Sequence, residues 1–253
     1  MENNPKHPDR LNKAHVLPFA AFMFFLIVMQ VAESLIGWDH PAAPWWKRDV
    51  AQWVYPLQTL VVLGLLLRYW KTYRFDWSFK WSVIAVIFGV VGIGFWLLPT
   101  ALYDAWGLSG ETGGWKKWLG IAKRDEGFDP GIFENVGAYW TSLIMRFLRA
   151  VVIVALVEEI FWRGFVMRFC MDWNGDYWKQ PFGRAHLKSY LVVTLLFMLA
   201  HSTLDWAGAL VYGSLTYLLC VWSKSLGACV IMHAVANFLM GIYIISYGKY
   251  GLW

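Results

Sequence analysis

The sequence predicts an all-α, polytopic integral membrane protein, built as a helical bundle of about seven (six to eight) transmembrane helices. Of its 253 residues, 58% are hydrophobic and only 15% are charged. A soluble globular domain is about 45–50% apolar and about 25% charged, so one water-soluble core cannot bury this much apolar surface. The net charge of +5 fits the basic loops of a membrane protein, and no basic arm or motif indicates a nucleic-acid partner.

Seven apolar segments approach the length of about 20 residues that a helix needs to cross a bilayer. These candidate spans are Val16–Gly37, Trp53–Trp70, Trp81–Leu98, Ala150–Met167, Ser189–Ser202, Trp206–Trp222 and Leu226–Tyr247. The fifth is short, so we expect it to begin earlier or to be sheltered by protein. Tryptophans gather near the predicted span ends, as in the aromatic belts of membrane proteins.

Basic residues predict the sidedness of the chain. The loop between the second and third spans carries four, namely Arg68, Lys71, Arg74 and Lys80, and the N-terminal leader carries Lys6, Arg10 and Lys13. The positive-inside rule places both segments in the cytoplasm, and for a bacterial source it indicates the inner membrane. Residues 99–139 then form a long external loop. We expect one membrane domain, in which residues 1–145 hold the N-terminal spans and this loop and residues 146–253 hold a catalytic helical core.

A few polar residues interrupt the later spans, where ionisable groups are costly and usually face the bundle interior. They are Glu158, Glu159 and Arg163 in the fourth span, His201 in the fifth, and His233 with Asn237 in the seventh. Glu159 and Arg163 are four residues apart and can pair on one helix face. Glu158 points about 100° away and is left as the free carboxylate. At about 1.5 Å of rise per residue, all three motifs fall near the middle of a hydrocarbon core about 30 Å thick.

This set of side chains can hydrolyse a peptide bond. A carboxylate and an imidazole can activate water, and a second histidine with an amide can stabilise an oxyanion. Several alternatives stay open. Glu158, His201 and His233 could bind a metal, although the chain has no H-E-x-x-H motif. A proton-coupled transporter would also place such groups at the midplane, but no internal repeat is present. The third alternative is a non-catalytic scaffold or immunity protein. Arg146 and Arg149 open the fourth span, where snorkelling would explain them.

The three motifs resemble those of a known family. The runs E-E-x-x-x-R (Glu158, Glu159, Arg163), F-x-x-x-H (Phe197, His201) and H-x-x-x-N (His233, Asn237) occur in the order typical of type II CAAX prenyl proteases, the CPBP or ABI group of intramembrane endopeptidases. The resemblance covers roughly Arg146 to Tyr247. The long Trp-rich loop resembles the CAAX-protease-related proteins of bacteria with exosortase systems.

The resemblance implies a role for each matching residue. Glu158 and His201 would activate the water, His233 and Asn237 would form the oxyanion site, and Glu159, Arg163 and Phe197 would support the helices. It implies no cofactor and no metal, and a membrane-associated protein or peptide as substrate. Eukaryotic members remove the last three residues of prenylated CAAX sequences, whereas bacterial members act on other substrates or serve in bacteriocin maturation and self-immunity. Oligomeric state is left open.

Overall fold

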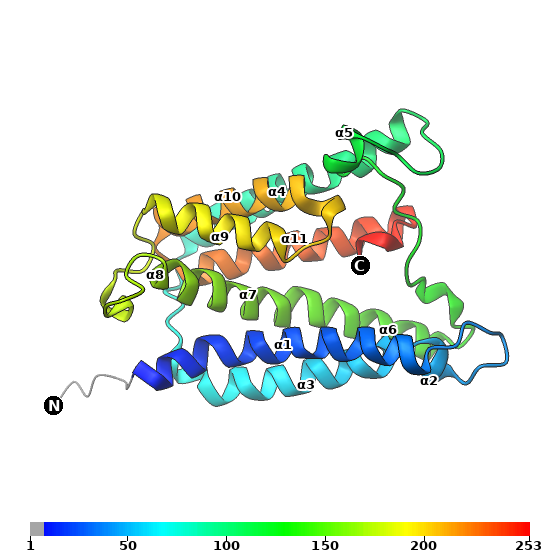
Figure 1. Ribbon diagram of the computed structural model, residues 1–253, viewed down its shortest axis with the longest axis horizontal. Coiled ribbons are helices and arrows are strands. Elements are labelled where there is room, and N and C mark those ends of the chain that lie inside the picture. The colour runs from blue at the N-terminus through cyan, green and yellow to red at the C-terminus, as the bar shows by residue number, and fades with distance from the viewer. Residues whose placement is uncertain (1–7) are drawn as a thin grey trace.

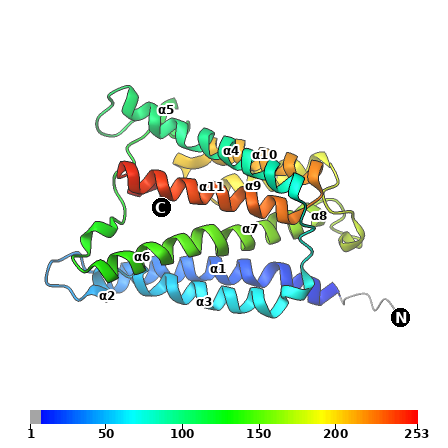
Figure 2. The same ribbon diagram turned by 180° about the vertical axis from the view of Figure 1, so that it is seen from behind.

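The computed structural model describes residues 8–253, and every regular element within them is a helix. Two groups of helices lie on either side of a long central one (Figures 1 and 2). On one side α1 (Pro8–Ile36) lies along α3 (Ala51–Tyr69), and on the other α4 (Phe79–Ala105) packs against α10 (Trp206–Ser223) and α11 (Leu226–Tyr247). This arrangement confirms the all-α bundle.

The central stretch runs without interruption from Val136 to Phe169. Its parts are α6 (Val136–Phe147), a π-helical segment (Leu148–Val154), α7 (Ala155–Phe161), a second π-helical segment (Trp162–Val166) and α8 (Met167–Phe169). The remaining helices are the short α2 (Trp45–Arg48), α5 (Trp115–Trp118) and α9 (Leu187–Leu199).

Five helical stretches in the described part of the chain are long and apolar enough to cross a membrane. They are Pro8–Ile36, Phe79–Ala105, Val136–Phe169, Thr203–Ser223 and Leu226–Tyr247. The other two predicted spans correspond to α3 and α9, and α9 has only 13 residues. At about 1.5 Å per residue it is about 20 Å long, too short to cross a hydrocarbon core of about 30 Å. The predicted count of about seven therefore includes two helices, α3 and α9, that do not qualify as membrane spans by length and composition alone.

Several predicted boundaries are wrong. Helix α1 begins at Pro8 rather than Val16, and Lys6 of the leader lies outside the described residues. Pro99 does not end the third span, because α4 continues through it to Ala105. The expected loop also ends early. The Asn135 side chain accepts a hydrogen bond of 3.0 Å from the backbone N–H of Ala138 and so caps a helix that begins at Val136.

The central stretch contributes to both hydrophobic cores. One core joins α1, α3 and α7 around buried residues such as Val62 and Ile160, and the other joins α4, α9, α10 and α11 around Phe197 and Met232. Helix α7, which carries Glu158 and Glu159, therefore lies between the two helix groups. This position places its polar side chains inside the bundle.

Candidate active site

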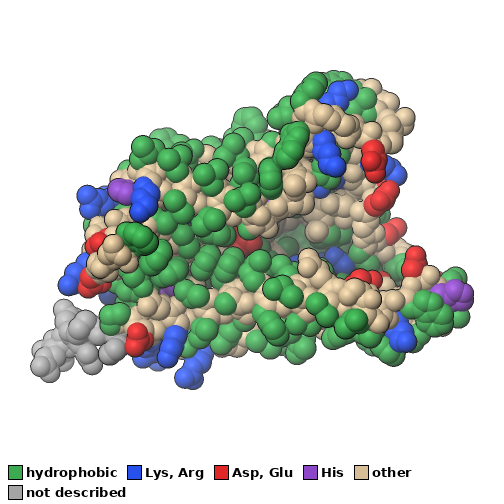
Figure 3. Space-filling view, in the orientation of Figure 1, with side chains coloured by type: hydrophobic (Ala, Val, Ile, Leu, Met, Phe, Trp, Pro, Cys, Tyr) green, Lys and Arg blue, Asp and Glu red, His purple; other side chains and the backbone are tan. Residues whose placement is uncertain are grey.

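The predicted polar residues meet at one cavity of about 430 Å³ between the two helix groups. Glu158 from α7, His201 from the turn after α9, and His233 and Asn237 from α11 all line it. Figure 3 shows the molecule hollowed in this region, with acidic and basic side chains inside the hollow. The cavity has the size of a small-ligand or peptide site.

A buried three-residue network braces one wall of the cavity. Glu159 and Arg163 are 0% and 1% exposed, and their Oε2 and Nε atoms lie 3.3 Å apart. Arg163 also donates from Nη1 to Glu159 Oε1 at 3.3 Å. The expected pair is therefore present, and Glu159 Oε1 additionally lies 2.8 Å from Nδ1 of His233. This last contact links α7 to α11 and was not predicted.

Glu158 is left outside this network. It is half-buried and lines the cavity, and its Oε2 atom is buried without a hydrogen-bond partner among residues 8–253. A buried polar atom without a partner is uncommon and often marks a functional position. Helix geometry explains why Glu158 is left out. The adjacent residue, Glu159, contacts both Arg163 and His233, whereas Glu158 points about 100° away on the helix.

His201 lies in the turn that follows α9, because that helix ends at Leu199 rather than continuing to Ser202 as predicted. Its Nδ1 atom is 2.7 Å from the carbonyl oxygen of Phe197. A carbonyl only accepts, so Nδ1 carries the hydrogen and Nε2 remains as the basic nitrogen of the neutral ring. The ring also packs edge-on against Trp96 at 5.1 Å. The contact with Phe197 follows from the F-x-x-x-H spacing.

Asn237 reaches the π-helical part of the central stretch. Its Nδ2 atom donates to the carbonyl of Ala150 at 2.7 Å, across 87 positions of sequence. A π-helix bonds i to i+5 and is rare outside functional sites, and here two π-helical segments flank α7. The amide has a second N–H donor, so this contact leaves one donor for the cavity. No proline or glycine pattern in the sequence signals the first π-helical segment.

The alternative metal site is not assembled. In the part of the chain that the structure describes, no three His, Cys, Asp or Glu side chains are grouped so that they could hold a metal ion. The ligand set Glu158, His201 and His233 therefore finds no support from the placement of these side chains.

Two further residues that the sequence did not assign to the site also line the cavity. The helix that carries Arg146 and Arg149 begins at Val136, about three to four turns before them. Nε of Arg149 donates to Gln58 of α3 at 2.6 Å. The sequence did not predict this helix start, because residues 134–139 have low hydropathy.

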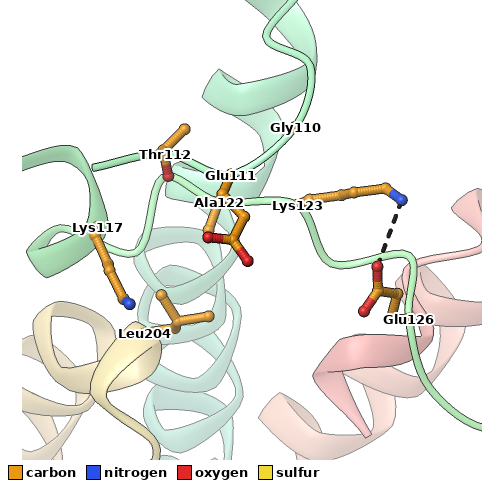
Figure 4. A pocket seen from close by; sticks show the side chains of 8 residues that line it. All are labelled: Gly110, Glu111, Thr112, Lys117, Ala122, Lys123, Glu126 and Leu204. Atoms are coloured by element: carbon orange, nitrogen blue, oxygen red, sulfur yellow. Dashed lines mark ion pairs between the residues drawn. The ribbon is translucent and has the colours of Figure 1, made fainter.

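A smaller pocket of about 320 Å³ lies in the loop of residues 107–135 (Figure 4). Lys123 and Glu126 pair across 3.7 Å at its edge, and Leu204, from the turn after His201, forms another part of its wall. None of the predicted site residues lines it. The pocket shows instead that the loop is docked against the turn that carries His201.

Comparison with known proteins identifies a family similarity over the segment that carries the three motifs. Residues 140–239 match the family described as "Rce1-like: Type II CAAX prenyl endopeptidase Rce1-like", and the match contains all three motifs. No curated protein and no solved structure matches the chain. The matched segment comprises most of the central helical stretch together with α9, α10 and the part of α11 that carries His233 and Asn237. Residues 140–239 are therefore similar to the Rce1-like family of type II CAAX prenyl endopeptidases, and the long apolar helices indicate an integral membrane protein.

Proposed function

We propose that this protein is an intramembrane endopeptidase of glutamic type that hydrolyses a peptide bond in a membrane-associated protein or peptide. The observation that carries the proposal is the unpartnered Oε2 of Glu158 in a cavity that it shares with His201, His233 and Asn237. The family assignment supports a peptidase. The roles of the individual residues are those that the resemblance of the motifs implies, and the shared cavity supports them.

Glu158 and His201 are the groups suited to activate water. The Glu158 carboxylate has a free oxygen, and His201 holds its proton on Nδ1 and so offers Nε2 as an acceptor. In the proposed step, the base takes a proton as the water oxygen attacks the peptide carbonyl carbon. That proton then passes to the leaving amine as the C–N bond breaks.

His233 and Asn237 are the groups suited to stabilise the oxyanion of the tetrahedral intermediate. Asn237 has one amide N–H beyond its bond to Ala150. Glu159 lies 2.8 Å from Nδ1 of His233, and the proposed role requires the ring in its imidazolium form. In that form Nε2 also carries a hydrogen and can donate to the developing negative charge.

The orientation of the protein in the membrane is inferred from its basic residues. By the positive-inside rule we place the N-terminus in the cytoplasm and, for a bacterial source, the protein in the inner membrane. Residues 107–135 and the C-terminus then lie on the outer side. Tagging each terminus and testing its accessibility in intact cells would check this orientation.

Cleavage by the full-length protein in liposomes tests the proposed activity. A library of peptides carrying an N-terminal acyl chain would be incubated with the protein, and products would be identified by mass spectrometry. We expect Glu158→Gln to lower the rate by about 100- to 10,000-fold, the usual contribution of a general base. We also expect a chelator to leave the rate unchanged.

Glu111→Gln is the matched control, because Glu111 lies in the exposed loop away from the cavity. Unaltered cleavage by Glu158→Gln would refute the proposed mechanism. Uptake driven by a pH gradient and dependent on Glu158, without cleavage, would favour a transporter. Full complementation in cells by the Glu158→Ala, His201→Ala double variant would favour a scaffold or immunity role.

A further inference from the structure

A tyrosine that lies outside the three motifs lines the same cavity as the groups assigned to hydrolysis. Tyr212 belongs to α10, is 3% exposed, and shares the cavity of about 430 Å³ with Glu158, His201 and His233. Its hydroxyl oxygen is buried and has no hydrogen-bond partner among residues 8–253. Such a hydroxyl is uncommon, because nothing offsets the cost of removing it from water, and it often marks a functional position.

Aromatic contacts fix the position of the Tyr212 ring. Its centre lies 5.8 Å from that of His233. It also lies 5.9 Å from the ring centre of Trp96 and 6.1 Å from that of Phe197. A Cβ atom added at Gly92 of α4 would lie 2.9 Å from Cδ2 of Tyr212, so glycine at this position leaves room for the ring. Packing therefore holds the ring beside the histidine proposed to stabilise the oxyanion, and no bond from the hydroxyl is needed to orient it.

The charged groups that act on Tyr212 do not bind its hydroxyl. Tyr212 interacts electrostatically with Glu159, Arg163 and Glu158. Glu159 Oε1 lies 2.8 Å from Nδ1 of His233, and its Oε2 lies 3.3 Å from Nε of Arg163. Neither glutamate accepts a hydrogen bond from the Tyr212 hydroxyl. The described part of the chain therefore offers this hydroxyl no acceptor, and a bound substrate can supply one.

Position separates Tyr212 from the other buried polar groups that lack a hydrogen bond. Some of them, such as the Thr194 hydroxyl, belong to residues that do not line the cavity. Those that line it are Glu158, Tyr212 and Trp253. The Trp253 ring packs on Phe147, whereas the Tyr212 ring contacts the oxyanion histidine. Tyr212 is thus the hydroxyl placed beside the reacting groups.

We propose that the Tyr212 hydroxyl is a third donor of the oxyanion site and donates a hydrogen bond to the carbonyl oxygen of the scissile peptide bond as that oxygen becomes negative. This inference rests on the proposed hydrolytic function and extends it. In the tetrahedral intermediate this oxygen is an alkoxide that accepts several hydrogen bonds, of which His233 and Asn237 each offer one. The phenol keeps its proton throughout, so the reaction gains no additional proton transfer.

A buried phenol is suited to this role. It is a neutral donor, so it costs less to bury than a charged donor would. A hydrogen bond in a site that excludes water stabilises a developing negative charge more strongly than the same bond in water. The cost of burying the free hydroxyl is then offset only in the transition state, which is the condition for raising the rate. Glu158 Oε2 is likewise buried, so burial does not set the Tyr212 hydroxyl apart from the reacting groups.

Replacing Tyr212 by phenylalanine removes the hydroxyl and keeps the ring contacts. The full-length wild-type and Tyr212→Phe proteins would be compared in liposomes on the acylated peptide that the wild-type protein cleaves fastest. We expect kcat to fall by about 100- to 1000-fold, the usual effect of removing one oxyanion donor. KM should not change, because the bond forms only in the transition state. The thermal unfolding midpoint should stay the same or rise, since the hydroxyl has no partner to lose.

A transition-state analogue separates bonding to the oxyanion from general effects on packing. The probes are that acylated peptide and its phosphonamidate, in which a tetrahedral phosphorus with anionic oxygens replaces the scissile carbonyl. Each Kd would be measured on the Glu158→Gln protein with and without Tyr212→Phe. We expect Tyr212→Phe to weaken binding of the phosphonamidate by about tenfold or more, as loss of a charge-assisted hydrogen bond does, and to leave the Kd of the peptide unchanged.

Tyr217→Phe is the matched control on the same helix. The Tyr217 hydroxyl accepts a hydrogen bond of 2.9 Å from the backbone N–H of His186, donates to its carbonyl at 3.1 Å, and lies outside the cavity. Loss of these bonds should lower the unfolding midpoint. We expect kcat and the affinity for the phosphonamidate to stay unchanged, which is the opposite pattern to that of Tyr212→Phe.

The results that would overturn the proposal are distinct. If Tyr212→Phe cleaves as fast as the wild-type protein, hydrolysis stands and the role of the hydroxyl fails. If the variant is less stable and loses affinity for both probes equally, Tyr212 braces the Glu159 network instead. If kcat falls and the pH–rate profile shifts while the affinity for the phosphonamidate is unchanged, Tyr212 acts on Glu158 rather than on the oxyanion. A wild-type protein that cleaves no peptide would remove the proposed function and this inference with it, and that result depends on no variant.

Discussion

Adjacent glutamates on α7 have different surroundings, and this difference predicts different effects of the same substitution. Glu159→Gln removes the negative charge that holds Arg163, and an unpaired charge at a buried pair costs about 3–5 kcal/mol. Glu158 forms no ion pair within 4 Å in the described chain, so Glu158→Gln should change stability by less than about 1 kcal/mol. Unfolding of both variants in bicelles by increasing SDS would measure the difference. Equal losses of stability would contradict the prediction that Glu159 stabilises the fold and Glu158 does not.

At this scale the sequence predicts local contacts well and distant ones poorly. The pairing of Glu159 with Arg163 and the contact of His201 with Phe197 both follow from a spacing of four residues on a helix. The bond between Glu159 and His233 joins residues 74 positions apart, and it depends on how α7 and α11 pack. No periodicity in either helix contains that information. The sequence predicted a free carboxylate at Glu158 only because Arg163, the partner of the adjacent Glu159, lies four residues further along the same helix.

Close packing of α4 against α11 positions the helix that carries His233. A Cβ atom added at Gly89 would lie 2.8 Å from the carbonyl oxygen of Met232, whereas one added at Gly94 meets nothing within 4 Å. We expect Gly89→Ala to destabilise the protein by about 1–3 kcal/mol by overpacking and to lower cleavage, because α11 must shift. Gly94→Ala, on the same helix, should be neutral or stabilise by up to about 1 kcal/mol. Thermal unfolding together with cleavage rates would test both, and equal effects would refute close packing as the cause.

The sequence also predicts helices better than helix ends. Apolar runs locate all seven helical segments, since burial in lipid requires them, but the runs carry no mark of where a helix leaves the membrane. The central stretch therefore begins at Val136, far before the predicted Ala150, and Arg146 and Arg149 lie inside it. The π-helical segments are equally hidden, because they reflect packing and contacts such as that of Asn237 with Ala150. Because the helix begins earlier than predicted, Arg146 and Arg149 lie within it, and both line the cavity.

Across the whole molecule, the loop of residues 107–135, the C-terminus and the turn bearing His201 contact one another. The backbone N–H of Gly251 donates to the carbonyl of Arg124 at 2.8 Å, and the Lys249 ammonium lies 2.9 Å from Asp104 and 2.8 Å from Asp125. Burial lowers the pKa of Lys249, but its hydrogen bonds to these two aspartates raise it above its usual value. Such contacts join segments more than 120 residues apart, which explains why the sequence did not predict them. We refer to the loop of residues 107–135 and the C-terminus together as the cap.

The ion pair of Arg124 with Asp205 connects this cap to the cavity. Asp205 also accepts a hydrogen bond from Ser202, next to His201, so the pair holds the turn from which His201 enters the cavity. We expect Arg124→Ala and Asp205→Ala each to lower the cleavage rate, and the double variant to lose little more than either single one. Residues in contact typically show a coupling energy of about 0.5–3 kcal/mol. Lys123→Ala, which breaks the exposed pair with Glu126, is the control and should have little effect. Additive losses from Arg124→Ala and Asp205→Ala would show that the two residues act separately. The turn would then be held by its other contacts, such as the bond from Trp206 Nε1 to the carbonyl of His201.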